Sequence, residues 1–150
     1  MSIIFNGSNI NNINYKGTKL NKVIYNNVEV FNNVVKDYSI SIGMPSTYGT
    51  TDVSKAFNKP INITKLQVSY NQWIADDITM SWNANVRIRN ANTKQWVTLD
   101  SSTINAPPQK SYNYNKTFTS IPNNYYDMVS VRIYDPNRCS AVTVVINGFY

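Results

Sequence analysis

Side chains able to perform acid–base or nucleophilic chemistry are scarce in this chain of 150 residues. The sequence contains no histidine and a single cysteine, Cys139, so serine–histidine and cysteine–histidine arrangements cannot form and the commonest zinc ligand is missing. The eight acidic residues fall mostly at expected turns, whereas a glycosidase needs two carboxylates facing each other across a cleft. No glycine-rich phosphate-binding loop occurs. The sequence therefore predicts a protein that is not an enzyme and that needs no cofactor.

One acidic pair, Asp76 and Asp77, follows Trp73 in the segment YNQWIADD. A loop of this kind could stack Trp73 on a sugar ring while the carboxylates bind hydroxyls or a calcium ion. Calcium takes roughly six to eight oxygen ligands, however, and two adjacent carboxylates supply too few. We favour the alternative, a polar turn between two strands that covers a half-buried Trp73, and we predict no metal site.

Aromatic side chains beside expected loops are the second group of candidates. The chain has eleven tyrosines and three tryptophans, and rings with a polar tip suit contacts with glycans or proteins. Trp82 has the inward parity of a strand and is expected in the core, whereas Trp96 is expected in the core or at an edge. The residues expected to contact a ligand are Trp73, Tyr112, Tyr114 and Tyr125, although loop tyrosines in such a chain could equally form ordinary surface.

The net charge of +6 raises the question of a nucleic-acid partner. The lysines are spread along the chain, however, and arginine occurs only four times, so we expect no nucleic-acid binding. Arg87 and Arg89 share the outward parity of one strand. They could bind an acidic partner or form an ordinary solvated face of a sheet.

The sequence also limits the compartment. One cysteine allows no intrachain disulfide. No apolar run approaches the ~20 residues of a membrane span, and the first residues lack the pattern of a signal peptide. We therefore expect no membrane association and a protein of a bacterial cytoplasm, or of a particle assembled there.

Composition and alternation predict an all-β fold. Isoleucine, valine, threonine and tyrosine abound, whereas Glu29 is the only glutamate, which leaves little material for exposed helical faces. From residue 37 onward, strands and turn signals alternate about every ten residues, as in an antiparallel β-sandwich of jelly-roll type. Its expected core comprises Trp82, Val86, Ile88, Val131, Ile133, Val144 and Ile146.

Three local patterns sharpen this prediction. In the expected strand 78–89, alternate residues beginning with Ile78 face the core. In the strand 61–70 the apolar parity changes at Thr64 and Lys65, as a β-bulge would cause. Residues 44–60 are expected to form a loop with a short helical turn near 53–57.

Residues 1–36 have a different rhythm, with short strands and turn pairs, and are expected to form a separate attachment module ahead of the domain 37–150. Asn26 and Asn27 separate two apolar runs and favour a tight hairpin. Such a hairpin is marginal in isolation and needs a partner surface, which strand addition at its free edge could supply. The residues expected at this assembly interface are Leu20, Val23, Tyr25, Val28, Val30 and Phe31.

The segment INNINYKGTKLNKVIYNNVEVF resembles a short module of small tail and minor structural proteins of phages that infect low-GC Gram-positive bacteria. Those proteins usually have glycine in the second turn, where this chain has Asn27. The region that follows is similar in rhythm to galactose-binding-type jelly rolls of phage and bacterial surface proteins. These resemblances imply a virion or phage-tail-like particle, with other particle proteins as partners, a multi-copy or homo-oligomeric arrangement, and a host-surface glycan as a possible ligand.

Two functions therefore remain open. The first is a structural protein of such a particle, in its tail, its baseplate or a capsid decoration, that is attached through its N-terminal hairpin. The second is a free-standing carbohydrate-binding module of lectin type.

Overall fold

The computed structural model describes residues 34–150 in full and, before them, the backbone of six short strands. These strands are β1 (Ile3–Phe5), β2 (Ser8–Ile10), β3 (Ile13–Tyr15), β4 (Thr18–Leu20), β5 (Lys22–Tyr25) and β6 (Val28–Asn32). They pair antiparallel in three successive hairpins, β1–β2, β3–β4 and β5–β6. The hairpin expected around Asn26 and Asn27 is therefore present in the backbone.

The three hairpins repeat every ten residues and share the pairing beside the turn, whereas β5–β6 alone has a register shift, between Val23 and Ile24. Phe5 pairs with Ser8, Tyr15 with Thr18 and Tyr25 with Val28, and each pair encloses two residues of sequence. In sequence, Ile3, Ile13 and Val23 begin the repeats, and Ile10, Leu20 and Val30 end them. The short strands expected in residues 1–36 thus form three copies of one hairpin unit, a repeat that the sequence analysis did not recognise.

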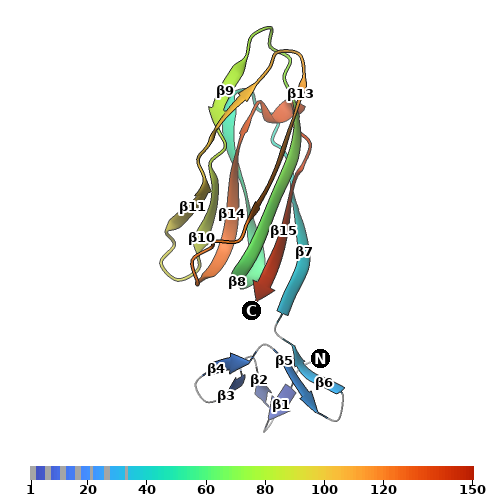
Figure 1. Ribbon diagram of the computed structural model, residues 1–150, viewed down its shortest axis with the longest axis vertical. Helices are drawn as coiled ribbons and strands as arrows, with labels where there is room; N and C mark the ends of the chain where they lie inside the picture. The colour runs from blue at the N-terminus through green and yellow to red at the C-terminus, as the bar shows by residue number, and fades with distance from the viewer. Residues whose placement is uncertain are drawn as a thin grey trace.

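The rest of the chain is an antiparallel β-sandwich, as predicted. Its strands are β7 (Val34–Ile42), β8 (Thr50–Trp73), β9 (Met80–Asn83), β10 (Val86–Asn90), β11 (Trp96–Asp100), β12 (Thr103–Ala106), β13 (Ser111–Phe118), β14 (Tyr125–Tyr134) and β15 (Val142–Phe149), with a 3₁₀ turn η1 (Pro136–Arg138). The main sheet has the order β11-β10-β14-β8-β15-β7, with β13 also paired to β8, and β9 pairs with β12. Figure 1 shows the hairpins beyond the end of the sandwich where β15 finishes.

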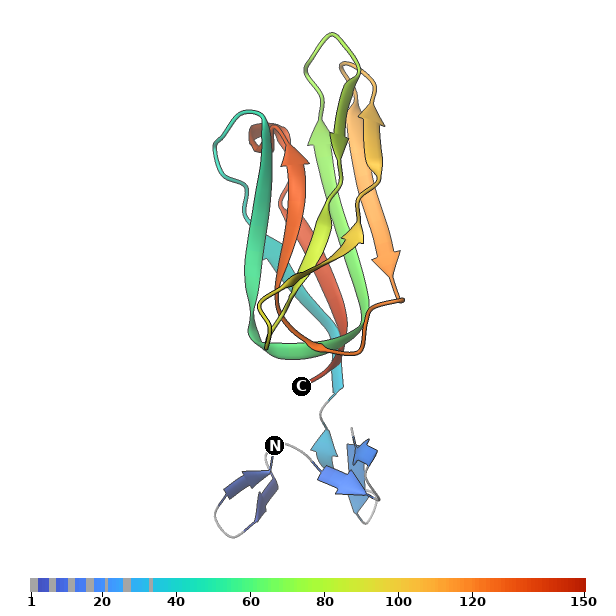
Figure 2. The same ribbon diagram turned by 90° about the vertical axis from the view of Figure 1, so that its left-hand side faces the viewer.

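Strand β8 joins the two layers of the sandwich. Its first part, up to Asn62, pairs with β14, and its second part pairs with β15 and β13. In Figure 2 the strand runs down one layer, crosses the lower end and rises in the other. Strand β8 therefore belongs to both layers. Its first part lies in the layer of β14 and β10, and its second part lies in the layer of β13 and β15, and each layer has its own outer face.

The register between β8 and β15 shifts where the sequence predicted a bulge. Lys65 pairs with Asn147, but the next pair along is Ile63 with Gly148, so Thr64 is the extra residue. A Cβ atom at Gly148 would lie 2.1 Å from the backbone oxygen of Asn62. Position 148 is therefore restricted to glycine by the close approach of the two strands.

The core lies between the two layers and contains all seven residues predicted for it: Trp82, Val86, Ile88, Val131, Ile133, Val144 and Ile146. Alternation along β9, β10, β14 and β15 places these side chains inward. The sequence prediction of an all-β sandwich with this core is confirmed.

Three local predictions were wrong. Ile78 is 68% exposed and precedes β9, because the inward alternation begins only at Met80. Residues 50–60 belong to strand β8 and contain no helical turn; only Val53 and Phe57 face the core there, too sparsely to show alternation. The sandwich also begins at Val34 rather than residue 37, because β7 starts there and Val35 is buried.

Candidate functional site

The outer face of β8 and β13 consists of uncharged polar side chains and one tryptophan. Because side chains alternate along a strand, every second residue of each strand points outward. The register places Asn71 opposite Asn113, Ser69 opposite Asn115 and Trp73 opposite Ser111. We call this surface the polar face, formed by Gln67, Ser69, Asn71 and Trp73 of β8, Ser111, Asn113, Asn115 and Thr117 of β13, and Thr143 of β15.

Amide groups link the two strands across this face. Asn71 Nδ2 donates to Asn113 Oδ1, and Gln67 Nε2 donates to Asn115 Oδ1 at 3.0 Å. Each amide carries two N–H donors and a carbonyl with two lone pairs, so these bonds use only part of its capacity. The face therefore presents both donors and acceptors to solvent without a net charge.

A shallow depression of about 350 Å³ lies over these amides. Asn71, Asn113 and Asn115 line it together with Ser140 and Thr143. Two hydrogen bonds fix the rim of the depression: Asn71 N–H donates to Ser140 Oγ at 2.8 Å, and Ser140 N–H donates to the Asn71 carbonyl at 2.8 Å. Amide and hydroxyl groups thus converge on a surface supported by paired strands.

Trp73 lies at the end of the polar face and is 46% exposed. It is the last residue of β8, and Asn71 precedes it on the same face. An exposed indole beside amide groups provides an apolar surface next to donors and acceptors. Of the four aromatic residues predicted to contact a ligand, Trp73 has the placement that such a contact requires.

Two of the other aromatic candidates point into the sandwich. Tyr114 is buried and stacks on Tyr70 with the ring centroids 4.9 Å apart. Tyr112 is half-buried and meets the core residue Trp82 edge-on at 5.8 Å. Both rings stand on the inward parity of β13, so neither shares the outer surface with Trp73.

The fourth candidate, Tyr125, is half-buried at the start of β14, where it pairs with Asn62. Asn62 begins the second part of β8 and Trp73 ends it, so Tyr125 and Trp73 lie near opposite ends of that part of the strand. The structure therefore does not bring the four predicted ligand residues together.

The Tyr114 hydroxyl belongs to a buried polar cluster. It donates to Asp100 Oδ2 at 2.6 Å, and Lys116 Nζ donates to the same oxygen at 2.7 Å. Burial alone would raise the pKa of Asp100, but the hydrogen bonds from Lys116, Tyr114 and Ser102 outweigh it and hold that pKa at about 2. Burial and the adjacent Asp100 carboxylate raise the pKa of the Tyr114 phenol. This cluster connects β13 to the end of β11.

The acidic pair forms separate contacts, as expected for a polar turn. Asp76 accepts a hydrogen bond from the Tyr134 hydroxyl at 3.2 Å, and Asp77 accepts one from Gln109 at 2.5 Å. Among the residues that the structure describes, no group of three or more histidine, cysteine, aspartate or glutamate side chains could hold a metal ion.

The predicted assembly residues stand on the paired backbone of the hairpins, in β4 (Leu20), β5 (Val23, Tyr25) and β6 (Val28, Val30, Phe31). Their side chains lie outside the described residues, so the interface stays a prediction.

The amides of the polar face were missed by the sequence analysis. The signal was present as alternation: Gln67, Ser69 and Asn71 occupy every second position, and so do Asn113 and Asn115. In a chain so rich in asparagine, however, single polar residues carry no information until the register sets them side by side.

No protein family matches the sequence, and no curated protein matches it. The solved structures similar to this chain include the crystal structure of a carbohydrate-binding module specific for non-crystalline cellulose, CBM28. The two have a TM-score of 0.39 and 12% sequence identity, over 85% of this chain and 78% of that one. Within the described residues, no helix is long and apolar enough to span a membrane.

Proposed function

We propose that this protein is a non-catalytic binding protein whose sandwich recognises a neutral glycan on the polar face. The observation that carries the proposal is the row of amide groups of β8 and β13 beside the exposed Trp73. A sugar hydroxyl both donates and accepts hydrogen bonds, and an amide does the same. A face without charge offers no Coulomb attraction to an ion, so a neutral ligand suits it best.

The roles of the residues follow from their positions. The Trp73 indole stacks against the apolar face of a sugar ring. Asn71, Asn113 and Asn115 then hydrogen-bond its hydroxyls through the donors and acceptors that the amide pairs leave unused. The shallow depression accommodates the side of an extended chain of sugars rather than enclosing a single ring.

The N-terminal repeats support a second part of the proposal, attachment to a larger particle. The strand partners of β1–β6 all lie within the three hairpins themselves. Isolated two-stranded hairpins are marginal in water, so a partner surface would stabilise them. We propose a phage or phage-tail-like particle assembled in the bacterial cytoplasm, and this choice rests on the sequence resemblance of residues 13–31.

Glycan binding is tested with a microarray of neutral oligosaccharides, followed by calorimetric titration of any glycan that binds. We expect Trp73→Ala to weaken binding about tenfold, as expected for the loss of one stacking contact. Asn113→Ala should weaken binding as well, whereas Tyr48→Ala, a substitution of an aromatic residue that is 73% exposed and belongs to neither outer face, serves as the control. Absence of binding to every neutral glycan, or an equal effect of Trp73→Ala and Tyr48→Ala, would rule out the polar face as a glycan site.

A further inference from the structure

The outer face of the other layer has a quite different chemistry. Three of the four arginines of the chain lie there, around an exposed tryptophan. We call this surface the arginine face, formed by Arg87 and Arg89 of β10, Lys94 of the β10–β11 turn, Trp96 of β11 and Arg132 of β14, with the carboxylates of Asp52 and Asp127.

Two guanidinium groups surround the Trp96 ring. Arg89 is the direct cross-strand partner of Trp96. The Cζ atoms of Arg87 and Arg89 lie 5.1 and 5.9 Å from the centroid of the indole, within the range of cation–π contacts. Trp96 nevertheless remains 38% exposed, so cationic groups and an accessible aromatic surface occur together.

Asp52 joins two of the arginines. Its Oδ1 accepts from Arg132 Nε at 2.7 Å, and its Oδ2 accepts from Arg132 at 3.0 Å and from Arg87 at 2.9 Å. The hydrogen bonds from Arg132 are the main reason that the pKa of Asp52 lies below its usual value.

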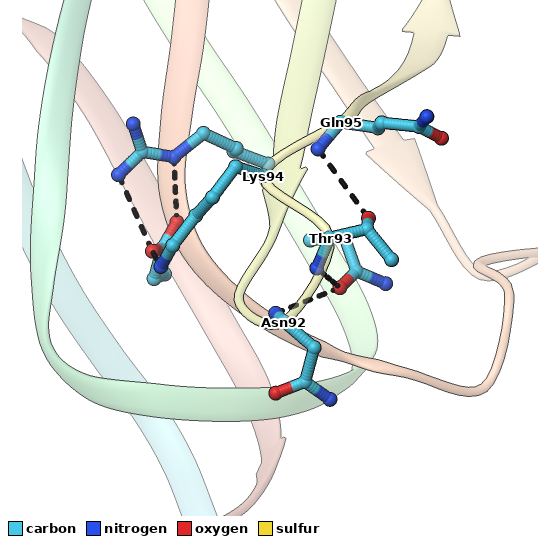
Figure 3. A network of polar contacts seen from close by, with 7 residues as sticks. Asn92, Thr93, Lys94 and Gln95 are labelled. Carbon is cyan, nitrogen blue, oxygen red and sulfur yellow. Dashed lines mark hydrogen bonds and ion pairs between the residues drawn. The ribbon is translucent and has the colours of Figure 1, made fainter.

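Asp127 is shared in the same way on the other side of the face. It accepts from Arg89 through both oxygens, at 2.8 and 3.2 Å, and from Lys94 Nζ at 2.7 Å. Figure 3 shows Lys94 extending to this ion pair from the turn. The turn itself is fixed by the Asn90 side chain, whose Oδ1 accepts from the backbone N–H groups of Asn92 and Thr93.

The two carboxylates do not neutralise this face. Four cationic side chains share two carboxylates, which leaves an excess of two positive charges. Both oxygens of each carboxylate are already engaged, whereas each guanidinium has five N–H donors and uses at most two of them here. The arginine face therefore has a surplus of charged donors that only further acceptors, and best an anion, can satisfy.

We propose that the arginine face binds an acidic polysaccharide whose sugar rings carry carboxylates, that is, a polyuronate. Planar guanidinium groups bind carboxylates through paired hydrogen bonds, as Arg89 and Arg132 already do within the protein. In a uronic acid the carboxylate is attached directly to the ring. A ring on Trp96 therefore brings its carboxylate close to the guanidinium groups that lie 5–6 Å from the indole centroid.

This site is separate from the glycan site on the polar face, because the two surfaces belong to the two layers that the first and second parts of β8 join (Figure 2). A nucleic acid fits the arginine face less well, since its phosphates are separated from the stacking base by the ribose. The lysines are also spread along the sequence and form no basic run of the kind typical of nucleic-acid-binding segments.

The test is a calorimetric titration of the full-length protein with hexagalacturonate at low salt. We expect binding that weakens as salt is added, and about tenfold weaker binding in Trp96→Ala. Lys94→Gln should also weaken binding; the Lys94 side chain is 61% exposed, so its replacement leaves the fold intact. Lys110→Gln, the same charge change at an exposed residue of the loop before β13, should bind like wild type.

Parallel titrations use a neutral galactan oligosaccharide, heparin and single-stranded DNA. Stronger binding of hexagalacturonate than of all three supports the proposal. Absence of hexagalacturonate binding overturns it, as does equal or stronger binding of the neutral galactan, heparin or DNA. Equal effects of Lys94→Gln and Lys110→Gln would also overturn it, because binding would then depend on overall charge and not on this face.

Discussion

The carboxylate of Asp100 is held inside the sandwich by three partners, Tyr114, Lys116 and the backbone N–H of Ser102. Its pKa of about 2 lies below the ordinary value of 3.8 that applies when the chain is unfolded. A group with a lowered pKa in the folded state stabilises the fold above its unfolded pKa. This stabilisation, about 2 kcal/mol, should be complete above about pH 4 and lost as the pH falls through about 2.

The measurement is the free energy of urea unfolding between about pH 2 and pH 5, for wild type and Asp100→Asn. The stability difference between the two should shrink as the pH falls, because the wild-type carboxylate then also loses its charge. Asp77→Asn, a change at an exposed aspartate, should follow the wild-type profile. A stability difference that stays constant across this range would show that the charge of Asp100 contributes nothing.

For single residues, the sequence predicted which side chains are buried better than it predicted which side chains form hydrogen bonds with each other. Parity identified Trp82 as a core residue correctly. The same argument would have placed Tyr114 inward, but its position between loops suggested a ligand contact instead. The hydrogen-bond acceptor of the Tyr114 hydroxyl, Asp100, lies at the end of a different strand, and no local sequence pattern connects Tyr114 with Asp100.

Strand β8 depends on one extra residue, and this leads to a prediction for the element as a whole. Thr64 forms the bulge that reverses the parity between Ile63 and Leu66, both of which are buried. Deleting Thr64 would only remove the bulge, whereas inserting one alanine between Leu66 and Gln67, where the pairing is regular, moves every following residue of β8 to the opposite face. Val68 and Tyr70 would then face solvent, at about 1.5–3 kcal/mol for each apolar side chain. Ser69 and Asn71 would turn into the core, at about 1–3 kcal/mol for each polar group left without a partner.

The summed loss is comparable to the whole stability of a typical domain, about 5–15 kcal/mol. We therefore expect the insertion variant to be unfolded or insoluble, as judged by circular dichroism and thermal melting. Thr64→Ala keeps the bulge and loses only the hydrogen bond from Thr64 Oγ1 to the Asn147 carbonyl, at 3.1 Å, so it should lose about 1 kcal/mol. Equal melting temperatures for the insertion variant and Thr64→Ala would show that the register of β8 is not fixed by its apolar side chains.

Elements with strict alternation were predictable from sequence, and those without it were not. The parity change at Thr64 was visible because apolar residues lie on both sides of it. The first part of β8 was missed because its outward residues are polar and only Val53 and Phe57 anchor it between residues 50 and 60. The pairing of the polar face also depends on register between distant strands, which sequence alone does not supply.

The whole molecule combines a sandwich that has two chemically distinct outer faces with a row of three hairpins. The polar face carries uncharged amides, whereas the arginine face carries the excess positive charge. In the part of the chain that the structure describes, β1–β6 pair within the hairpins, so their pairing does not contribute to the sheet of the sandwich. The proposed attachment and the two proposed binding sites therefore use separate parts of the molecule.

The last prediction concerns this division of the chain. Deleting residues 1–32 removes β1–β6 but keeps β7 complete, so the truncated protein should remain folded and soluble. Deleting residues 1–36 also removes Val34, Val35 and Lys36 from β7, and Val35 is a core residue that is 5% exposed. The longer deletion should therefore be less stable by about 1–3 kcal/mol, measured by urea unfolding.

The shorter deletion then tests attachment without disturbing the core. We expect mass spectrometry to detect the full-length protein in purified particles from its own host, and not the variant that lacks residues 1–32. If that variant unfolds, the hairpins contribute to the stability of the sandwich and are not a separate module. If it folds and still joins the particles, the docking surface lies on residues 34–150, and the arginine face and the polar face become the surfaces to test for that contact.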